Sequence, residues 1–266
     1  MPDSPPSASF LLPLIEMLSA AVFWGTIGCH ELGRRLAQHR HTKDPAGASS
    51  GIRTVETAAF GLMGLITAFT FAAAAQRFEA RRQLVLEEAN TISTAWARLD
   101  VLPPDRQPGL RQKFRGYLDS RLRTYQRLDD FTATRAEMAV SASTWSAIWE
   151  EGVAAARSEG SPAATMLLLP ALNQMSDVAT ARTLALMTHH PPVIVGLLAG
   201  LSLLSGLLAG YASVPGGSRN WLHIAGLALI LSMSFYVILD LDYPRAGLIR
   251  LEFGDHLLVD LRRSMN

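Results

Sequence analysis

Four apolar blocks, each long enough to cross a bilayer as a helix, constrain this chain more than any other feature. They cover residues 10–29, 54–75, 193–214 and 221–239, and most of the charge lies between them. About twenty apolar residues match the ~30 Å hydrocarbon core of a bilayer. Because an unpaired backbone amide is costly in lipid, each block is expected to be helical. The sequence therefore predicts an all-α polytopic membrane protein with four transmembrane helices.

The first block is interpreted as a retained span rather than a secretory signal. No Lys or Arg precedes it, and Pro13 and Glu16 interrupt its apolar run. A secretory signal would need a basic segment before its apolar core and a small-residue cleavage site after it.

The spans divide the chain into four predicted parts. The second span is followed by no Pro or Gly before Val101, so we expect it to leave the membrane as one long helix that ends ahead of Pro103. The parts are a first transmembrane pair with a short tail (1–75), an extramembrane helical insert continuous with span two (76–192), a second transmembrane hairpin (193–240) and a C-terminal extramembrane segment (241–266).

The insert carries helical patterns along its whole length. Apolar residues recur at alternating spacings of three and four from residue 85 to residue 99, which is typical of a helix packed against another helix. Further helices are expected over residues 111–128, 132–158 and 162–188. The arginine-rich stretch RQKFRGYLDSRLRTYQR is interpreted either as a site for anionic lipid head groups or as a solvated helix face.

Small residues recur four apart on two of the spans. In lipid, such residues let two helix backbones approach closely, so they mark a candidate helix-packing interface within one chain or between chains. The candidate positions are Gly64, Ala68 and Ala72 on span two and Gly196, Gly200, Gly206 and Gly210 on span three.

Four spans place both termini and the insert on the same side of the membrane. Basic residues near the membrane ends are almost evenly divided between the two sides, and long segments count less in this comparison. We expect a multi-pass protein of the cell (inner) membrane with the insert and both termini in the cytoplasm.

The sequence offers no site for enzyme chemistry. Cys29 is the single cysteine, which excludes an intrachain disulfide. Nucleotide-binding, hydrolase and zinc-protease motifs are missing, and the His pairs have poor spacing for a shared metal. A net charge of +1 gives no case for nucleic-acid binding. We therefore expect no catalytic, cofactor-binding or metal-binding residues, and a protein that is not an enzyme.

Several segments together carry a family resemblance. They are FEARRQLVLEEANTISTAWARLDVLP, then RGYLDSRL, then the spaced Asn173, Asp177 and Arg182, and finally YVILDLDYPRAGLIRLEFGDHLLVDLRRSM. On these residues the chain resembles the bacterial bestrophin-like membrane proteins, a domain of unknown function. The resemblance implies four spans, a helical insert and a homo-oligomer. The remoter relation to true bestrophins, which are pentameric anion channels, implies ion conduction.

The polar residues of these segments form a candidate cluster on the insert side of the membrane. They make either a buried structural network or the lining of a vestibule. The cluster comprises Glu88, Asn90, Arg98, Asn173, Asp177, Arg182, Asp240, Asp242 and Arg245.

Two functions follow from the sequence. The first is a homo-oligomeric ion (anion) channel or pore, with the lipid bilayer, further copies of the chain and a small inorganic ion as partners. The alternative is a non-conducting membrane scaffold or sensor whose helical insert binds a protein partner.

Overall fold

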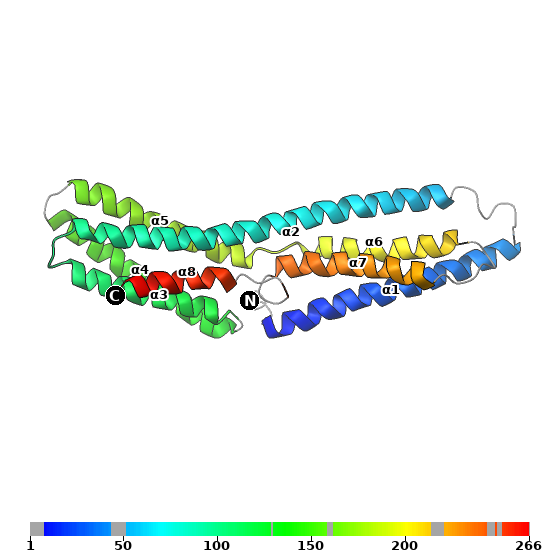
Figure 1. Cartoon of the computed structure of the whole chain (residues 1–266), viewed down its shortest axis with the longest axis horizontal. Coiled ribbons are helices and arrows are strands. Elements are labelled where there is room, and N and C mark those ends of the chain that lie inside the picture. Colours follow the sequence, from blue (N-terminus) through cyan, green and yellow to red (C-terminus); the bar gives the residue numbers. More distant parts are fainter. Residues whose placement is uncertain are drawn as a thin grey trace. The chain divides into compact units, whose positions relative to one another are not determined.

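The computed structural model describes residues 8–43, 52–128, 130–158, 162–213, 221–243, 248 and 252–265. Within these residues every regular element is a helix (Figure 1). In chain order they are α1 (Ala8–Lys43), α2 (Ile52–Ala97), the 3-10 helix η1 (Arg98–Val101), α3 (Gln107–Gln126), α4 (Phe131–Ser158), α5 (Pro162–Met187), α6 (Pro192–Ala212), α7 (Trp221–Asp242) and α8 (Glu252–Ser264).

Among the described residues, four segments are long and apolar enough to cross a membrane. They are Leu12–Arg40 in α1, Thr54–Val101 in α2 and η1, Pro162–Ala212 over α5 and α6, and Trp221–Asp242 in α7. The predicted all-α polytopic membrane fold is therefore confirmed. Span two continues without a break as the 46-residue α2 and ends in η1 ahead of Pro103, as the missing helix breakers predict. The helix α8 was not predicted.

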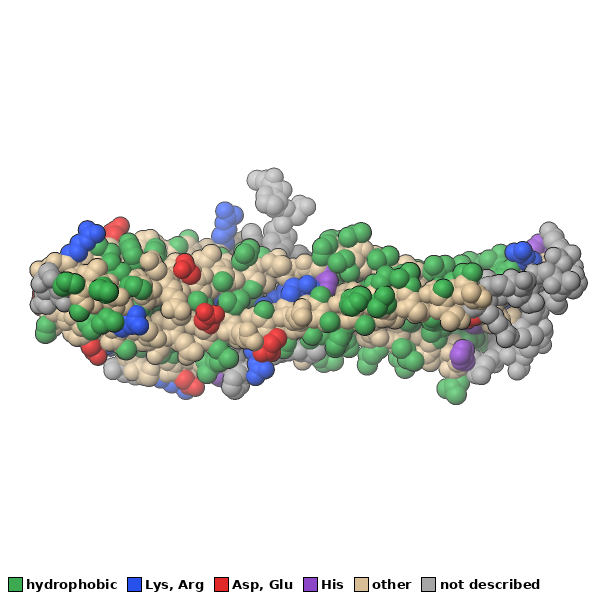
Figure 2. Space-filling model, turned by 90° about the horizontal axis from the view of Figure 1, so that it is seen from above, with side chains coloured by type: hydrophobic (Ala, Val, Ile, Leu, Met, Phe, Trp, Pro, Cys, Tyr) green, Lys and Arg blue, Asp and Glu red, His purple; other side chains and the backbone are tan. Residues whose placement is uncertain are grey.

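Contacts group the chain into two units, described here separately. The insert unit comprises the described residues of Met1–Phe10, Phe78–Thr188 and Arg250–Asn266, and the span unit those of Leu11–Arg77 and His189–Ile249. Figure 2 shows charged side chains scattered over the face of the insert unit and mainly hydrophobic ones over the face of the span unit. The division into four parts stays a prediction.

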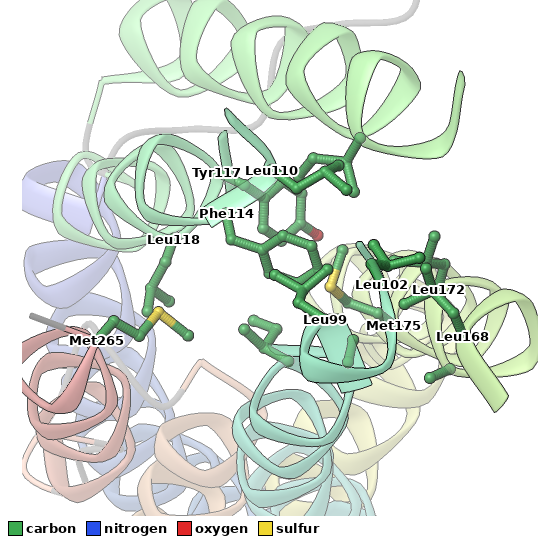
Figure 3. Packing of buried hydrophobic residues seen from close by; sticks show 14 of the residues in the cluster. Leu99, Leu102, Leu110, Phe114, Tyr117, Leu118, Leu168, Leu172, Met175 and Met265 are labelled. Atoms are coloured by element: carbon green, nitrogen blue, oxygen red, sulfur yellow. The ribbon is translucent and has the colours of Figure 1, made fainter. Parts of the chain in front are cut away.

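The core of the insert unit is built where the apolar seam of α2 meets α3, α4 and α5. Figure 3 shows Leu99 close to Phe114 from α3 and Met175 from α5, all of them fully buried. Trp96 stands edge-on to Phe114 with a centroid distance of 6.2 Å. Burying such large side chains supplies the main driving force for closing the bundle.

The C-terminal helix α8 packs on α3 in the same unit. Leu258 and Met265 enter the insert core. Arg262 donates two hydrogen bonds to the Asp119 carboxylate, at 2.7 and 3.3 Å, and Arg115 donates one to the Met265 carbonyl oxygen at 2.6 Å. The chain thus returns to the insert unit after its last span.

In the span unit, α1 and α6 approach each other through glycines. A Cβ added at Gly206 would lie 2.7 Å from the Thr26 carbonyl oxygen, and one at Gly210 would overlap the His30 backbone. From the other side, a Cβ at Gly33 would overlap the backbone of Leu207. Only glycine lets the two backbones lie this close.

Several hydroxyl groups buried among the spans bond within their own helices. Thr26 donates to the Val22 carbonyl at 2.7 Å, Ser202 to the Leu198 carbonyl at 2.8 Å, and Ser19 to the Ile15 carbonyl at 2.8 Å. Such bonds satisfy the hydroxyl without a partner helix, which is what an apolar environment requires.

Candidate functional site

A buried charged network lies at the centre of the insert unit and joins α2, α3 and α5. Arg121 Nε donates to Glu88 Oε1 at 2.6 Å, and Arg182 Nη1 donates to Glu88 Oε2 at 2.5 Å. The Tyr125 hydroxyl donates to Glu88 Oε2 at 2.8 Å and accepts from Arg121. All four side chains are buried, and Glu88 has no exposed surface.

The aromatic ring of Tyr125 completes the surroundings of both cations. The Arg182 guanidinium lies 3.4 Å from the ring centroid and the Arg121 guanidinium 4.9 Å from it. The electron-rich face of an aromatic ring attracts a cation, most strongly where water is excluded. The Glu88 carboxylate and the Tyr125 ring therefore contact both guanidinium groups, and Arg121 also donates to the Ala179 carbonyl oxygen at 3.4 Å.

Burial and the Glu88 carboxylate together determine the protonation states of Tyr117, Tyr125 and Arg121 on α3. Burial raises the pKa of the Tyr117 hydroxyl to about 12, and burial together with the Glu88 carboxylate raises the pKa of Tyr125 well above its ordinary value. Burial by itself would lower the pKa of Arg121, but the Glu88 carboxylate outweighs it and this pKa is raised. Both tyrosines are neutral and Arg121 is charged at physiological pH.

Two further arginines of this unit tie α2 and η1 to the backbone of α5. Arg81, which is buried, donates to the carbonyl oxygens of Ala185 at 3.0 Å and Thr188 at 2.6 Å, at the C-terminal end of α5. A cation is favourable there because the last carbonyls of a helix lack amide partners. Arg98 donates to the Leu167 carbonyl at 2.6 Å, one turn before Pro170 interrupts α5.

A second cluster lies in the span unit, where α2, the residues ahead of α6 and the end of α7 meet. Arg77 Nε donates to Asp242 Oδ1 at 3.0 Å, and the backbone amide of His190 donates to Asp242 Oδ2 at 2.7 Å. The His190 ring also lies 3.2 Å from that oxygen. Asp242 is buried, so the cluster fastens the exit of the last span.

The structure distributes the predicted polar cluster over several places. Glu88 and Arg182 meet in the buried network, whereas Arg98 caps a carbonyl of α5. Three members are exposed on outward faces of the insert unit, namely Asn90, Asn173 and Asp177. Asp240 and Asp242 are buried at the end of α7 in the span unit, and Arg245 lies outside the described residues.

Sequence reasoning missed the α3 half of the buried network. The signal was present, because Arg121 shares one helix face with Phe114, Leu118 and Tyr125, at spacings of four, three and four. An arginine within an apolar seam needs a buried anion. The arginine-rich stretch hid this position, because its other basic residues are partly or fully exposed.

The predicted small-residue positions separate into two groups. Gly206 and Gly210 pack against α1, as described above. The remaining five, Gly64, Ala68, Ala72, Gly196 and Gly200, are exposed on the chain, and the three glycines among them have no atom within 4 Å of an added Cβ.

No group of three or more His, Cys, Asp or Glu side chains close enough to hold a metal ion occurs among the described residues. The side chains of the buried network are at most about 5% exposed to solvent. Its geometry suits the holding of three helices together.

The family comparison covers most of the chain. The model of the Bestrophin-like domain matches residues 20–252, a stretch that contains all four spans except the start of the first, and the helical insert. No curated protein and no solved structure matches the chain. The protein is a membrane protein that belongs to the bestrophin-like family.

Proposed function

We propose that this protein is the subunit of a homo-oligomeric channel in the cell membrane that conducts a small inorganic anion. Membership of the bestrophin-like family supports the proposal, because true bestrophins are anion channels built from several copies of one chain. The choice of an anion depends on this relation, and the flux experiment below therefore compares chloride with potassium.

The observation that carries the proposal is the outward face of α2 within the membrane. Met63, Thr70 and Ala74 are buried against the span unit. The opposite face of the helix carries the exposed small residues Gly61, Gly64, Ala68 and Ala72. Exposed Leu65 and Phe71 border this strip directly, and Leu62 and Phe69 lie further round the helix.

A strip of small residues on the outside of a single chain favours contact with another helix. Lipid tails are as apolar as leucine, so nothing requires a lipid-facing helix to be small along one line. A second copy approaching this strip would gain close van der Waals contact. Repeating the contact around an axis normal to the membrane would close a ring around a central path.

Replacing Ala68 by phenylalanine tests this role of α2. Overpacking a close helix contact costs roughly 1–3 kcal/mol. We therefore expect chloride flux into proteoliposomes to fall by about tenfold or more. The control is Leu62→Phe, which also adds volume at an exposed position of the same span but lies beside the strip, and it should leave the flux unchanged. Parent protein that passes neither chloride nor potassium would end the channel proposal.

The insert and both termini are proposed to lie in the cytoplasm. Basic residues on the opposite side are nearly as numerous, so the orientation needs a direct measurement. A periplasmic alkaline phosphatase reporter fused after residue 45 is expected to be active, and a green fluorescent protein fused there to stay dark. The reverse pattern would invert the topology.

The second candidate function is a non-conducting scaffold or sensor. It is favoured by large apolar side chains exposed on α5 in the insert unit, including Met166 and Leu184. A scaffold predicts tight liposomes and a different protein crosslinked to this surface. The flux measurement on the parent protein separates the two candidates.

A further inference from the structure

The solvent face of α5 is unusual for a helix outside the membrane. Over its 26 residues α5 has two charged side chains, Asp177 and Arg182. Arg182 is buried in the network with Glu88, so Asp177 is the single charge on the exposed surface of α5. A surface helix normally carries charged residues on its outer face. The outer face of α5 therefore has the composition of a contact surface.

Apolar exposure in the insert unit concentrates on the same region. Met166 is 74% exposed, Leu184 65% and Met187 61%, all on α5. Leu86 of α2 and Val101 of η1 are also exposed, at 41% and 40%. Exposed apolar groups of this size, gathered on neighbouring helices, mark an interaction surface.

The internal contacts of the insert unit set the register between α2 and α5. Arg81 lies level with residues 185–188, Glu88 with Arg182, and Arg98 with Leu167. The two helices therefore run antiparallel. Asn90 lies between Glu88 and Arg98 on α2, and Asp177 lies between Arg182 and Leu167 on α5. Asn90 and Asp177 therefore lie at a similar height along the two helices.

The same register arranges the two outward faces in three matching levels. Near the Arg81 end, Leu86 of α2 lies level with Leu184 of α5. In the middle, exposed Asn90 lies level with exposed Asp177. At the far end, Val101 lies level with Met166. At these three levels the named residues of each face are apolar, polar and apolar in turn, and the α2 and η1 face also exposes Glu87 and Asp100.

We propose that the outward face of α5 binds the outward face of α2 and η1 of a second copy of this chain. The proposal builds on the homo-oligomer of the proposed function and names its interface outside the membrane. Copies related by an axis normal to the membrane sit at the same depth. Residues that are level within one chain are then level between neighbours as well.

The matching levels on the two outward faces favour a second copy of the chain as the partner that covers the outward face of α5. Leu184 meets Leu86, Met166 meets Val101, and the Asn90 amide donates to the Asp177 carboxylate of the neighbour. In these three pairs a polar group meets a polar one and an apolar group meets an apolar one. If the contact is repeated in one direction about an axis normal to the membrane, it closes a ring of copies.

Disulfide crosslinking between differently tagged chains tests the contact. Both chains carry Cys29→Ser, which removes the single native thiol. One chain also carries Asn90→Cys and the other Asp177→Cys, both at exposed positions. The chains are co-expressed, and isolated membranes are oxidised with copper phenanthroline. We expect a dimer band that carries both tags.

The control pair combines Asn90→Cys with Met166→Cys. Met166 lies level with Val101, which is about 16 Å along the helix from Asn90, too far for a disulfide. The matched pair should give several-fold more mixed dimer than this control. Equal yields, dimers of the Asn90→Cys chain alone, or no dimer would each overturn the proposed interface.

Flux measured on the same membranes separates this inference from the channel itself. Chloride flux without the mixed crosslink leaves the proposed function standing and places the interface elsewhere. The mixed crosslink without flux supports the interface and rejects the channel.

Discussion

Replacing Glu88 by glutamine is expected to unfold the insert unit at a temperature well below that of the parent protein. Glutamine keeps the size of the side chain but removes the carboxylate that Arg121 and Arg182 share. Both guanidinium groups would then stay charged and buried after losing the carboxylate that they share. Removing one partner of a buried ion pair costs roughly 3–5 kcal/mol.

Circular dichroism during heating in detergent measures this effect. A loss of this size should lower the Tm by about 10 °C or more. Glu87→Gln is the matched control, because it removes the same charge from the neighbouring position, which is exposed. The control should melt like the parent. If the two variants melt together, the buried network does not hold the helices.

The second large effect is expected at Gly210, where a single methyl group should separate α1 from α6. The Cβ of Gly210→Ala would overlap the carbonyl oxygen of His30 and lie 2.6 Å from its carbonyl carbon. Backbone cannot rotate away as a side chain does, so one helix must move. Overpacking of this kind costs roughly 1–3 kcal/mol, and we expect the upper end of that range.

Gly200→Ala on the same helix is the control for this substitution. An added Cβ there meets open space, and alanine is the better helix former. In detergent, the Gly210→Ala protein should therefore melt below the parent, and the Gly200→Ala protein should melt at the same temperature as the parent or above it. A Gly210→Ala protein as stable as the parent would show that α1 and α6 do not pack through this glycine.

Much of the fold could be predicted from local patterns. The length of the four apolar blocks matches the thickness of a bilayer and so predicts the four spans. The lack of Pro or Gly after Ala75 predicts that α2 runs on to η1. Prolines and turn residues likewise bound α3, α4 and α5 close to the predicted ranges. The helix α8 was missed, although its apolar and charged residues lie on separate faces.

The candidate site was harder to predict, because its members come from distant helices. The sequence picks out Glu88 and Arg182 as polar residues of a recognisable segment, but nothing local shows that they meet. Arg121 and Tyr125 join them only because the face of α3 that carries both residues packs against α2 and α5.

What the sequence by itself determined is the class of the protein, its four spans and the approximate bounds of α2 to α7, since these depend on hydropathy and on helix breakers along the chain. Only the tertiary structure decided which face of each helix is buried. It placed Glu88 inside and Asn90 outside, two residues apart on one helix, and it paired Gly206 and Gly210 with α1 while leaving Gly196 and Gly200 open. The physical reason is that helix periodicity fixes the angle between neighbouring side chains, whereas the direction of the partner helix is set by packing across the whole bundle.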